Sequence, residues 1–289
     1  MKKRILLFTA ALAAVLTPLT GLAACKSDTS PILFDSNSEI SVILPDAEAP
    51  TNSEFDSGSS GENSADSSTE NIPETPPTPQ STQYIRCTGD SVNLRSGAGT
   101  GYSVLGTAEK NTAYVVLGKS GGWYKTYYRG KIAYISASYV SVFSLEKSDT
   151  QTEEVLQQGY KLIGVPYVYG AVRLHDGKGN FLKGFTAQKF DCSSLVQYVF
   201  YQGAGKLLDV TTRTQIKQGK YVSRSALKRG DCIYFTNEER QHKTGTERIG
   251  HVAIYLGNDY ILHTASDYAR IEKMTAKRWS FYVEARRFL

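Results

Sequence analysis

The sequence predicts a multidomain protein in which a small all-β domain precedes an α+β domain. The length of 289 residues suggests about two domains. Residues 84–145 are dense in short strand and turn patterns, whereas residues 150–289 combine a capped helical pattern with strands of alternating polarity. A leader and a long polar segment precede both domains.

Residues 1–24 have the pattern of a secretory signal. Basic residues 2–4 begin the chain, and an apolar run over 5–24 follows, interrupted at Pro18 and ending in small residues. A lone membrane-spanning helix is the alternative interpretation. Leu22-Ala-Ala-Cys25 resembles a bacterial lipobox, and that resemblance implies that Cys25 is acylated and holds the protein on a membrane.

Residues 25–83 are predicted to be a disordered acidic tether. The segment is rich in Ser, Thr, Pro, Asp and Glu, with 11 acidic residues and one Lys between 26 and 83. Such a composition cannot bury a core. Fully stretched, the segment would reach roughly 190 Å, so a protein attached to a membrane through Cys25 could act at that distance from it.

Residues 84–289 are basic, with 29 Lys and Arg against 17 Asp and Glu. A basic body favours anionic partners, or is simply a solvated surface. The predicted secretion argues against nucleic acid. Anionic wall polymers and peptidoglycan carboxylates fit an extracytoplasmic location.

Two segments of 84–145 resemble a bacterial SH3-like barrel. They are Val92-Asn-Leu-Arg-Ser-Gly-Ala-Gly99 and residues 121–128, and Ala133-Tyr134 departs from the Gly-Trp that the family commonly has. The resemblance implies wall targeting or a wall of a catalytic groove. The alternative is a structural role, because aromatic residues on a small barrel are more often core. The wall-binding candidates are Asn93, Arg95, Trp123 and Tyr134.

Residues 188–201 predict a helix that begins at a candidate nucleophile. Asp191 is a plausible N-cap, which places Cys192 in the first turn. Leu195, Val199 and their neighbours are spaced as one face of a helix. Free N–H groups and the helix dipole favour a thiolate there, and the thiolate is the reactive form of cysteine. A buried structural cysteine is the alternative.

Two of the four histidines are predicted to meet on a hairpin. His251 begins a strand pattern that runs to Gly257, and His263 lies in a second strand. Gly257-Asn-Asp259 is a hairpin turn signal, and pairing about it places residues near 263–266 opposite His251. Two imidazoles on neighbouring strands suit a base and the group that orients it.

Several ordered motifs over residues 150–289 resemble the NlpC-type cysteine peptidases. They are Gly164-Val-Pro-Tyr-Val-Tyr-Gly170, Asp191-Cys-Ser-Ser-Leu-Val196, Lys228-Arg-Gly-Asp-Cys-Ile-Tyr-Phe235 and Gly250-His-Val-Ala-Ile-Tyr-Leu-Gly257. That family has a circularly permuted papain-like fold and cleaves bacterial cell-wall peptides.

The resemblance implies Cys192 as nucleophile, His251 as base and His263 as the third polar residue. Tyr167, Ser193 and Asp191 are candidates for positioning the oxyanion or the substrate. The backbone N–H of Cys192 would be an oxyanion donor.

The chain departs from the family pattern at three places. Ser194 stands where the family usually has Gly, and Val210 where it often has Arg. The run between Gly170 and Asp191 is longer than usual and contains the turn-rich segment Asp176–Asn180. We expect this loop to cover or reshape the substrate groove, or to be a surface insertion.

Cys87 and Cys232 remain after the lipid and nucleophile assignments. They pair in a disulfide or stay as buried thiols. No Cys and His spacing typical of metal sites is present, although Cys192, His251 and His263 are a conceivable zinc set. We expect no metal and no cofactor.

The sequence therefore predicts a secreted, lipid-anchored cysteine endopeptidase that remodels the cell wall. Family resemblance implies cleavage of peptidoglycan stem peptides, at the bond between γ-D-glutamyl and the diamino acid. Two alternatives stay open. One is an amidase or acyltransferase on the same fold, and the other is a non-catalytic wall-binding lipoprotein.

Overall fold

The computed structural model describes residues 80–289. The predicted signal 1–24, the predicted lipid attachment at Cys25 and residues 25–79 of the predicted tether lie outside the described residues. Within 80–289, no helix has both the length and the apolar character needed to cross a bilayer. The first described strand begins at Ser81, three residues before the domain start expected at 84.

An all-β domain occupies residues 81–146, as the strand and turn patterns predict. One of its two sheets has the order β3-β2-β7-β6-β5, and β8, β1 and β4 pair in the other. Leu94, Ala133 and Ile135 point inward from the five-stranded sheet and are fully buried. The elements are β1 (Ser81–Cys87), β2 (Ser91–Arg95), β3 (Val104–Glu109), β4 (Ala113–Val115), β5 (Gly118–Ser120), β6 (Trp123–Tyr128), β7 (Lys131–Ser136), η1 (Ala137–Tyr139) and β8 (Val140–Glu146).

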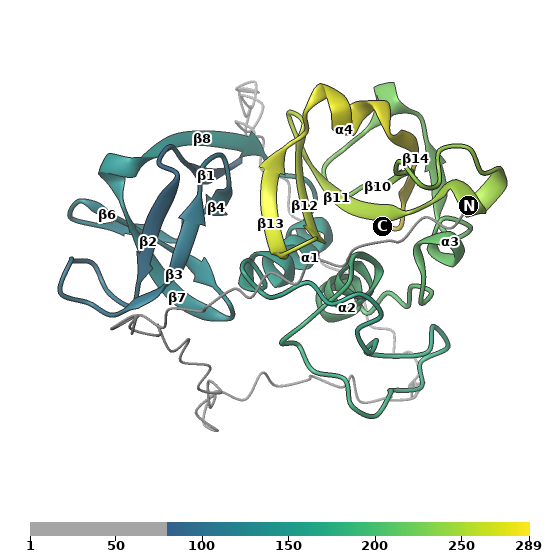
Figure 1. The fold of residues 1–289 in the computed structure, drawn as a ribbon, viewed down its shortest axis with the longest axis horizontal. Coiled ribbons are helices and arrows are strands. Elements are labelled where there is room, and N and C mark those ends of the chain that lie inside the picture. Colours follow the sequence, from purple (N-terminus) through teal and green to yellow (C-terminus); the bar gives the residue numbers. More distant parts are fainter. Residues whose placement is uncertain (1–79) are drawn as a thin grey trace, which may run out of the picture. The chain divides into compact units, whose positions relative to one another are not determined.

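An α+β domain follows, and helices α1 and α2 pack against each other beside its sheet (Figure 1). The elements are α1 (Thr150–Lys161), α2 (Cys192–Ala204), α3 (Thr212–Gln215), β9 (Lys220–Val222), η2 (Arg224–Ala226), β10 (Cys232–Phe235), η3 (Gly245–Arg248), β11 (His251–Gly257), β12 (Tyr260–Ala265), β13 (Tyr268–Lys273), α4 (Ala276–Ser280) and β14 (Tyr282–Arg287). The predicted order of an all-β domain before an α+β domain is confirmed.

One sheet of nine strands runs through both domains. Its order is β8-β1-β4-β13-β12-β11-β10-β14-β9, and the pairing of Ala113 with Ile271 joins the barrel strand β4 to β13. The turn between β6 and β7 also contacts the α+β domain, because the Gly130 N–H donates to the Lys161 carbonyl at 2.7 Å. This bond satisfies a carbonyl at the end of α1 that the helix itself leaves free.

Helix α2 begins at Cys192 because its N-terminus is doubly capped. The Asp191 carboxylate accepts from the Ser194 N–H at 2.8 Å, and the Ser194 hydroxyl accepts from the Asp191 N–H at 2.8 Å. Such a reciprocal pair stabilises a helix start by on the order of 1 kcal/mol per cap. Ser194, which replaces the usual Gly, thus fixes the helix start. Gly203 lets α2 approach α1, since a Cβ there would lie 2.4 Å from the Val155 Cα.

The predicted hairpin of β11 and β12 is present. Asn258 and Asp259 both have positive φ, 46° and 66°, as a tight turn of this kind requires. Ile254 pairs with Leu262, and continuing that register sets His251 opposite Ala265. His263 is therefore diagonal to His251 on the neighbouring strand, within side-chain reach.

Candidate active site

Cys192 and His251 line the same pocket of about 370 Å³. Tyr167 and Arg278 also line it, so side chains from four separate segments of the α+β domain meet there. The pocket lies where the start of α2 faces the start of β11. The predicted meeting of a helix-start cysteine with a strand histidine is thus present in the structure.

The Cys192 thiol is neutral in this environment. Burial raises its pKa to about 12, and the nearby Asp191 carboxylate adds to the shift. Backbone hydrogen bonds from Val252 and Ser193 oppose the shift but do not overcome it. The sequence predicts a thiolate at this helix start, whereas the burial of the helix start favours the neutral thiol, because burial disfavours charge.

His251 is a neutral base paired with His263. Its Nε2 lies 2.9 Å from His263 Nδ1, with the two rings nearly perpendicular. Burial lowers the pKa of His251 well below the usual histidine value, and the charges of His263 and Arg278 lower it further. At neutral pH His251 carries no charge, so one of its ring nitrogens can accept a proton.

Glu272 on β13 completes a chain of polar groups that the sequence analysis missed. Its Oε1 lies 3.2 Å from His263 Nε2, a close contact that is not aligned as a hydrogen bond. The same oxygen accepts a hydrogen bond from Arg278 at 2.8 Å. Burial alone would raise the pKa of Glu272, but His263, Arg278 and Arg270 outweigh it and lower the pKa to about 2.

The charge of Glu272 indicates which ring nitrogens of His263 and His251 carry hydrogen. A carboxylate only accepts, so the His263 Nε2 beside it carries hydrogen. His263 Nδ1 is then unprotonated and accepts from the Nε2–H of His251. The remaining nitrogen of His251, Nδ1, is left with a lone pair for the thiol proton. This arrangement of protons fits a base at His251 and an orienting group at His263.

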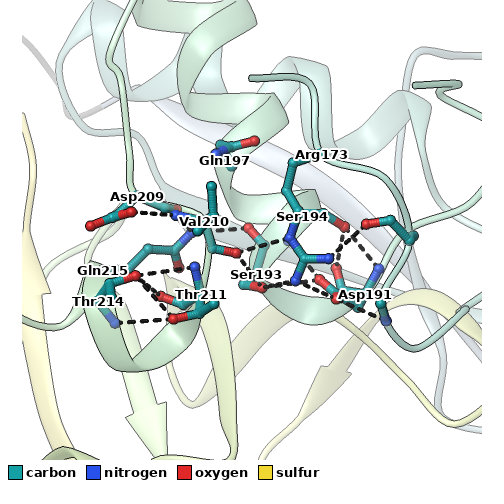
Figure 2. A network of polar contacts seen from close by, with 12 residues as sticks. Arg173, Asp191, Ser193, Ser194, Gln197, Asp209, Val210, Thr211, Thr214 and Gln215 are labelled. Atoms are coloured by element: carbon teal, nitrogen blue, oxygen red, sulfur yellow. Dashed lines mark hydrogen bonds and ion pairs between the residues drawn. The ribbon is translucent and has the colours of Figure 1, made fainter. Parts of the chain in front are cut away.

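Asp191 and Ser193 hold the start of α2 (Figure 2), and neither of them lines the pocket of Cys192. Arg173 donates to Asp191 at 2.7 Å and to Ser193 at 3.2 Å, and Ser193 donates to Asp191 at 3.0 Å. Both residues are almost fully buried. The structure places both side chains behind the nucleophile, with polar atoms bonded within the protein, and their role in positioning the oxyanion or the substrate stays a prediction.

Arg173 is a second residue that the sequence analysis missed. It comes from the long loop 171–190, and its Nε donates to the Val210 carbonyl at 2.9 Å (Figure 2). The loop therefore ties Asp191 to the segment before α3. None of residues 171–190 lines the pocket of Cys192, which favours the surface insertion over a loop that covers the groove.

Tyr167 lines the pocket with its phenol protonated. Burial, followed by the charges of Cys192 and Asp191, raises its pKa to about 12. Its main chain is fixed by a hydrogen bond from its N–H to the Asp267 carbonyl at 2.8 Å. A neutral phenol donates a hydrogen bond at any pH near neutrality.

The four wall-binding candidates share one face of the five-stranded barrel sheet. Asn93 and Arg95 alternate along β2, and Arg95 pairs with Tyr134. Tyr134 pairs with Lys125, two residues from Trp123. Residues that pair across strands lie on the same face, whereas Leu94 and Ile135 between them point into the core. None of the four lines the pocket of Cys192.

Cys87 and Cys232 are free, buried thiols. Burial raises the pKa of each. Of the two alternatives, a disulfide or two buried thiols, this structure has the two thiols. Among residues 80–289, no three His, Cys, Asp or Glu side chains are arranged to hold a metal ion.

Comparisons with known proteins match both domains. Residues 164–287 match the model of the NlpC/P60 family, and residues 90–141 match that of the bacterial SH3 domain. A solved NlpC/P60 family protein from Bacillus cereus aligns with a TM-score of 0.39 and 19% identity, covering 72% of this chain and 64% of that one.

Two curated relatives are moderately similar. The chain is 34% identical over 152 residues to the gamma-DL-glutamyl hydrolase of Bacillus subtilis, an alignment that covers 52% of this chain and 32% of the relative. It is 39% identical over 110 residues to the murein DD-endopeptidase MepS/murein LD-carboxypeptidase of Escherichia coli, covering 37% of this chain and 54% of the relative. The chain thus spans only about a third to a half of the length of these relatives. It carries a bacterial SH3 domain followed by a domain of the NlpC/P60 family.

Proposed function

We propose that this protein is a cell-wall cysteine endopeptidase that cleaves peptidoglycan stem peptides. The observation that carries the proposal is the shared pocket of Cys192 and His251, with His263 bonded to His251 at 2.9 Å. A nucleophile, a neutral base and an orienting group are the set that covalent acyl transfer requires. The NlpC/P60 match supports a hydrolase of the cell wall.

The proposed reaction starts from the neutral pair. His251 Nδ1 takes the thiol proton as Cys192 Sγ attacks the substrate carbonyl carbon. The Cys192 N–H and the Tyr167 hydroxyl donate to the oxyanion that forms. When the peptide C–N bond breaks, His251 gives its proton to the leaving amine, and a thioester remains. Water then attacks the thioester with His251 as base, which releases the carboxylate and restores the thiol.

We propose the bond between γ-D-glutamyl and the diamino acid as the one cleaved. The name of the Bacillus subtilis relative supports a γ-glutamyl substrate, whereas that of the Escherichia coli relative indicates other bonds. An extracytoplasmic location follows from a wall substrate, with Cys25 as the proposed lipid anchor. The shared face of Asn93, Arg95, Trp123 and Tyr134 is the proposed wall-binding surface of the barrel.

Mass spectrometry of muropeptides tests the proposal. Purified peptidoglycan is digested with the wild-type chain, with Cys192→Ala, and with Cys232→Ala as a control that removes another buried thiol. We expect new γ-D-glutamyl carboxyl termini with the wild type and the control, and a loss of about a million-fold in turnover with Cys192→Ala. New termini at the glycan–peptide amide would indicate an amidase. Wall binding without any product would indicate a non-catalytic lipoprotein.

A further inference from the structure

A second pocket, of about 470 Å³, lies where the barrel meets the NlpC/P60 domain. The pairing of Ala113 with Ile271 brings the turn before β4 next to strand β13, and side chains from both segments line the pocket. From the barrel come Arg86 on β1 and Lys110 in the turn. The pocket is thus built by the seam between the domains.

The lining of this seam pocket is strongly cationic. Five basic side chains and a single carboxylate line it: Arg86, Lys110, Arg270, Lys273, Arg278 and Glu272. Such a concentration of one sign of charge in a concave site raises the local concentration of anions.

Three of the five cations have acidic neighbours. Arg278 binds Glu272 at 2.8 Å, Arg270 lies 2.9 Å from Asp267 and 3.4 Å from Glu109, and Lys110 lies 3.6 Å from Asp90. The carboxylates of Asp90, Asp267 and Glu109 are 90%, 62% and 51% exposed, so water and salt screen them.

The other two cations, Arg86 and Lys273, have no ion pair among residues 80–289. A half-buried arginine and an exposed lysine therefore border the same pocket from opposite domains, each without an ion pair. Holding like charges together costs free energy, which a bound anion would recover.

We propose that the seam pocket binds a phosphate ester group of a soluble or wall-borne anionic polymer. A phosphate offers several acceptor oxygens to donors that approach from different sides, as these guanidinium and ammonium groups do. A carboxylate offers two oxygens, which one arginine fork satisfies. The Asn111 amide lines the pocket and supplies a neutral donor.

A membrane surface fits this site less well. Surfaces that bind bilayers combine cations with exposed apolar side chains that enter the lipid. The one large apolar residue in the lining is Met274, which is only 6% exposed. The pocket therefore selects the phosphate group of a polymer over the headgroups of a bilayer.

Direct binding to the full chain tests this site independently of hydrolysis. Inorganic phosphate and poly(glycerol phosphate) are titrated by 31P NMR and calorimetry at fixed ionic strength. Arg86→Gln/Lys273→Gln removes the two unpaired charges. Lys147→Gln/Lys220→Gln removes two exposed charges elsewhere and is the matched control. We expect the pocket variant to bind both probes at least about tenfold more weakly than the wild type does. The control variant should bind them as tightly as the wild type.

Four results would overturn the proposal. They are equal losses in both double variants, unchanged binding in the pocket variant, acetate binding as tight as phosphate, and binding to phosphatidylglycerol vesicles in place of the soluble polymer. Thermal melting checks that the double variant is folded. The single substitution Lys273→Gln, at an exposed position, must weaken phosphate binding in the same direction.

Discussion

The carboxylate of Glu272 gives the two histidines of the active site different roles. Because its pKa is lowered to about 2, it is ionised at neutral pH. It also raises the pKa of the buried His263, although burial dominates and lowers that pKa overall. In the proposed mechanism Glu272 is therefore a positioning residue that acts through His263.

Three substitutions test this order of roles by turnover on a defined muropeptide. His251→Ala should lose nearly as much as Cys192→Ala, and His263→Ala about one to two orders of magnitude less. Glu272→Gln should cost about tenfold, as expected for a contact worth on the order of 1–2 kcal/mol. A larger loss of turnover with His263→Ala than with His251→Ala would mean that His263 is the base and His251 the orienting group.

A pH profile separates positioning by Glu272 from mere structural support. Glu272→Gln removes a group that raises the pKa of His263, so the acid limb of kcat/KM should move to lower pH. Glu284→Gln is the control, because that carboxylate is 26% exposed against 25% for Glu272 and also pairs with an arginine. An unmoved limb would mean that Glu272 only supports the fold.

The buried thiol of Cys192 makes a second prediction at the residue scale. With its pKa raised to about 12, the thiolate fraction at pH 6 is far below that of free cysteine and rises about tenfold with each pH unit. Iodoacetamide should therefore alkylate Cys192 more slowly than free cysteine at pH 6, and faster as the pH rises to 9.

Mass spectrometry of the alkylated chain reads out each thiol. Cys192 should still react before Cys87 and Cys232, because it lines the pocket of about 370 Å³, whereas the other two line neither that pocket nor the seam pocket. A fast rate at pH 6 that stays constant with rising pH would instead indicate a thiolate–imidazolium pair with His251.

At the scale of elements, the sequence predicts contacts that are local and misses those that depend on distant pairing. The Asp191 cap and the turn Asn258–Asp259 are encoded within a few residues, so Cys192, His251 and His263 could be brought together from the sequence. Glu272 reaches His263 only because β13 pairs with β12, with Ile261 opposite Glu272.

Burial is the other property that local patterns do not encode. The helix start at Cys192 predicts a stabilised thiolate. The packing of β11 and α2 buries this thiol, and burial raises its pKa and favours the neutral form. In the same way, Ser193 looks available for substrate, but Arg173 from the loop 171–190 donates to its hydroxyl and Gln215 of α3 donates to its carbonyl. Solvent exclusion is a sum over the whole fold.

The long loop 171–190 separates into a tip and an anchored base. At the tip, Asp176 accepts from the Asn180 side chain at 2.7 Å and from the Lys178 N–H at 2.8 Å, so the turn is held by its own bonds. At the base, Arg173 binds Asp191, with only 18% and 6% of the two side chains exposed.

This division predicts different effects for two changes in the loop. Deleting Asp176–Asn180 should leave kcat/KM within about twofold, because exposed turn tips tolerate deletion. Arg173→Met should lower stability by about 2–3 kcal/mol and turnover by about tenfold or more, since it leaves the Asp191 charge unpaired and shifts the start of α2. Arg173→Lys keeps the charge but loses the forked donors of the guanidinium. Its stability and turnover should therefore fall between those of the wild type and those of Arg173→Met.

Melting curves and kinetics on two defined muropeptides measure both loop variants. If the tip deletion changes the preference between muropeptides while Arg173→Met does not affect turnover, the tip contacts substrate and the base is not needed to place Cys192.

At the scale of the whole molecule, a buried polar cluster fastens the barrel to the NlpC/P60 domain. Arg229 donates to Glu153 at 2.6 Å and to the hydroxyls of Tyr84 and Tyr160 at 2.8 Å each. Tyr84 belongs to β1, whereas Glu153 and Tyr160 belong to α1. All four side chains are largely buried, so each group depends on the others for its hydrogen bonds.

The seam is also closely packed next to the active site. Gly164 has φ +87°, and a Cβ there would lie 2.3 Å from the Tyr128 ring of the barrel. Its carbonyl accepts from the Arg129 side chain at 2.8 Å. The segment that carries Tyr167 into the pocket therefore rests on the barrel, and the two domains share one sheet as well.

These contacts predict that the two domains unfold as one cooperative unit. The two tryptophans of the chain report on them separately, since Trp123 is in the barrel and Trp279 in α4. In Trp279→Phe and Trp123→Phe variants, urea transitions followed by fluorescence should coincide.

Arg229→Met should lower the free energy of unfolding by about 3–5 kcal/mol in both tryptophan variants, because it leaves Glu153 buried without its cation. Arg229→Met/Glu153→Leu should recover much of that loss, since no unpaired charge then remains. Separate transitions for the two tryptophans, or a loss confined to one of them, would mean that the barrel is an independent module.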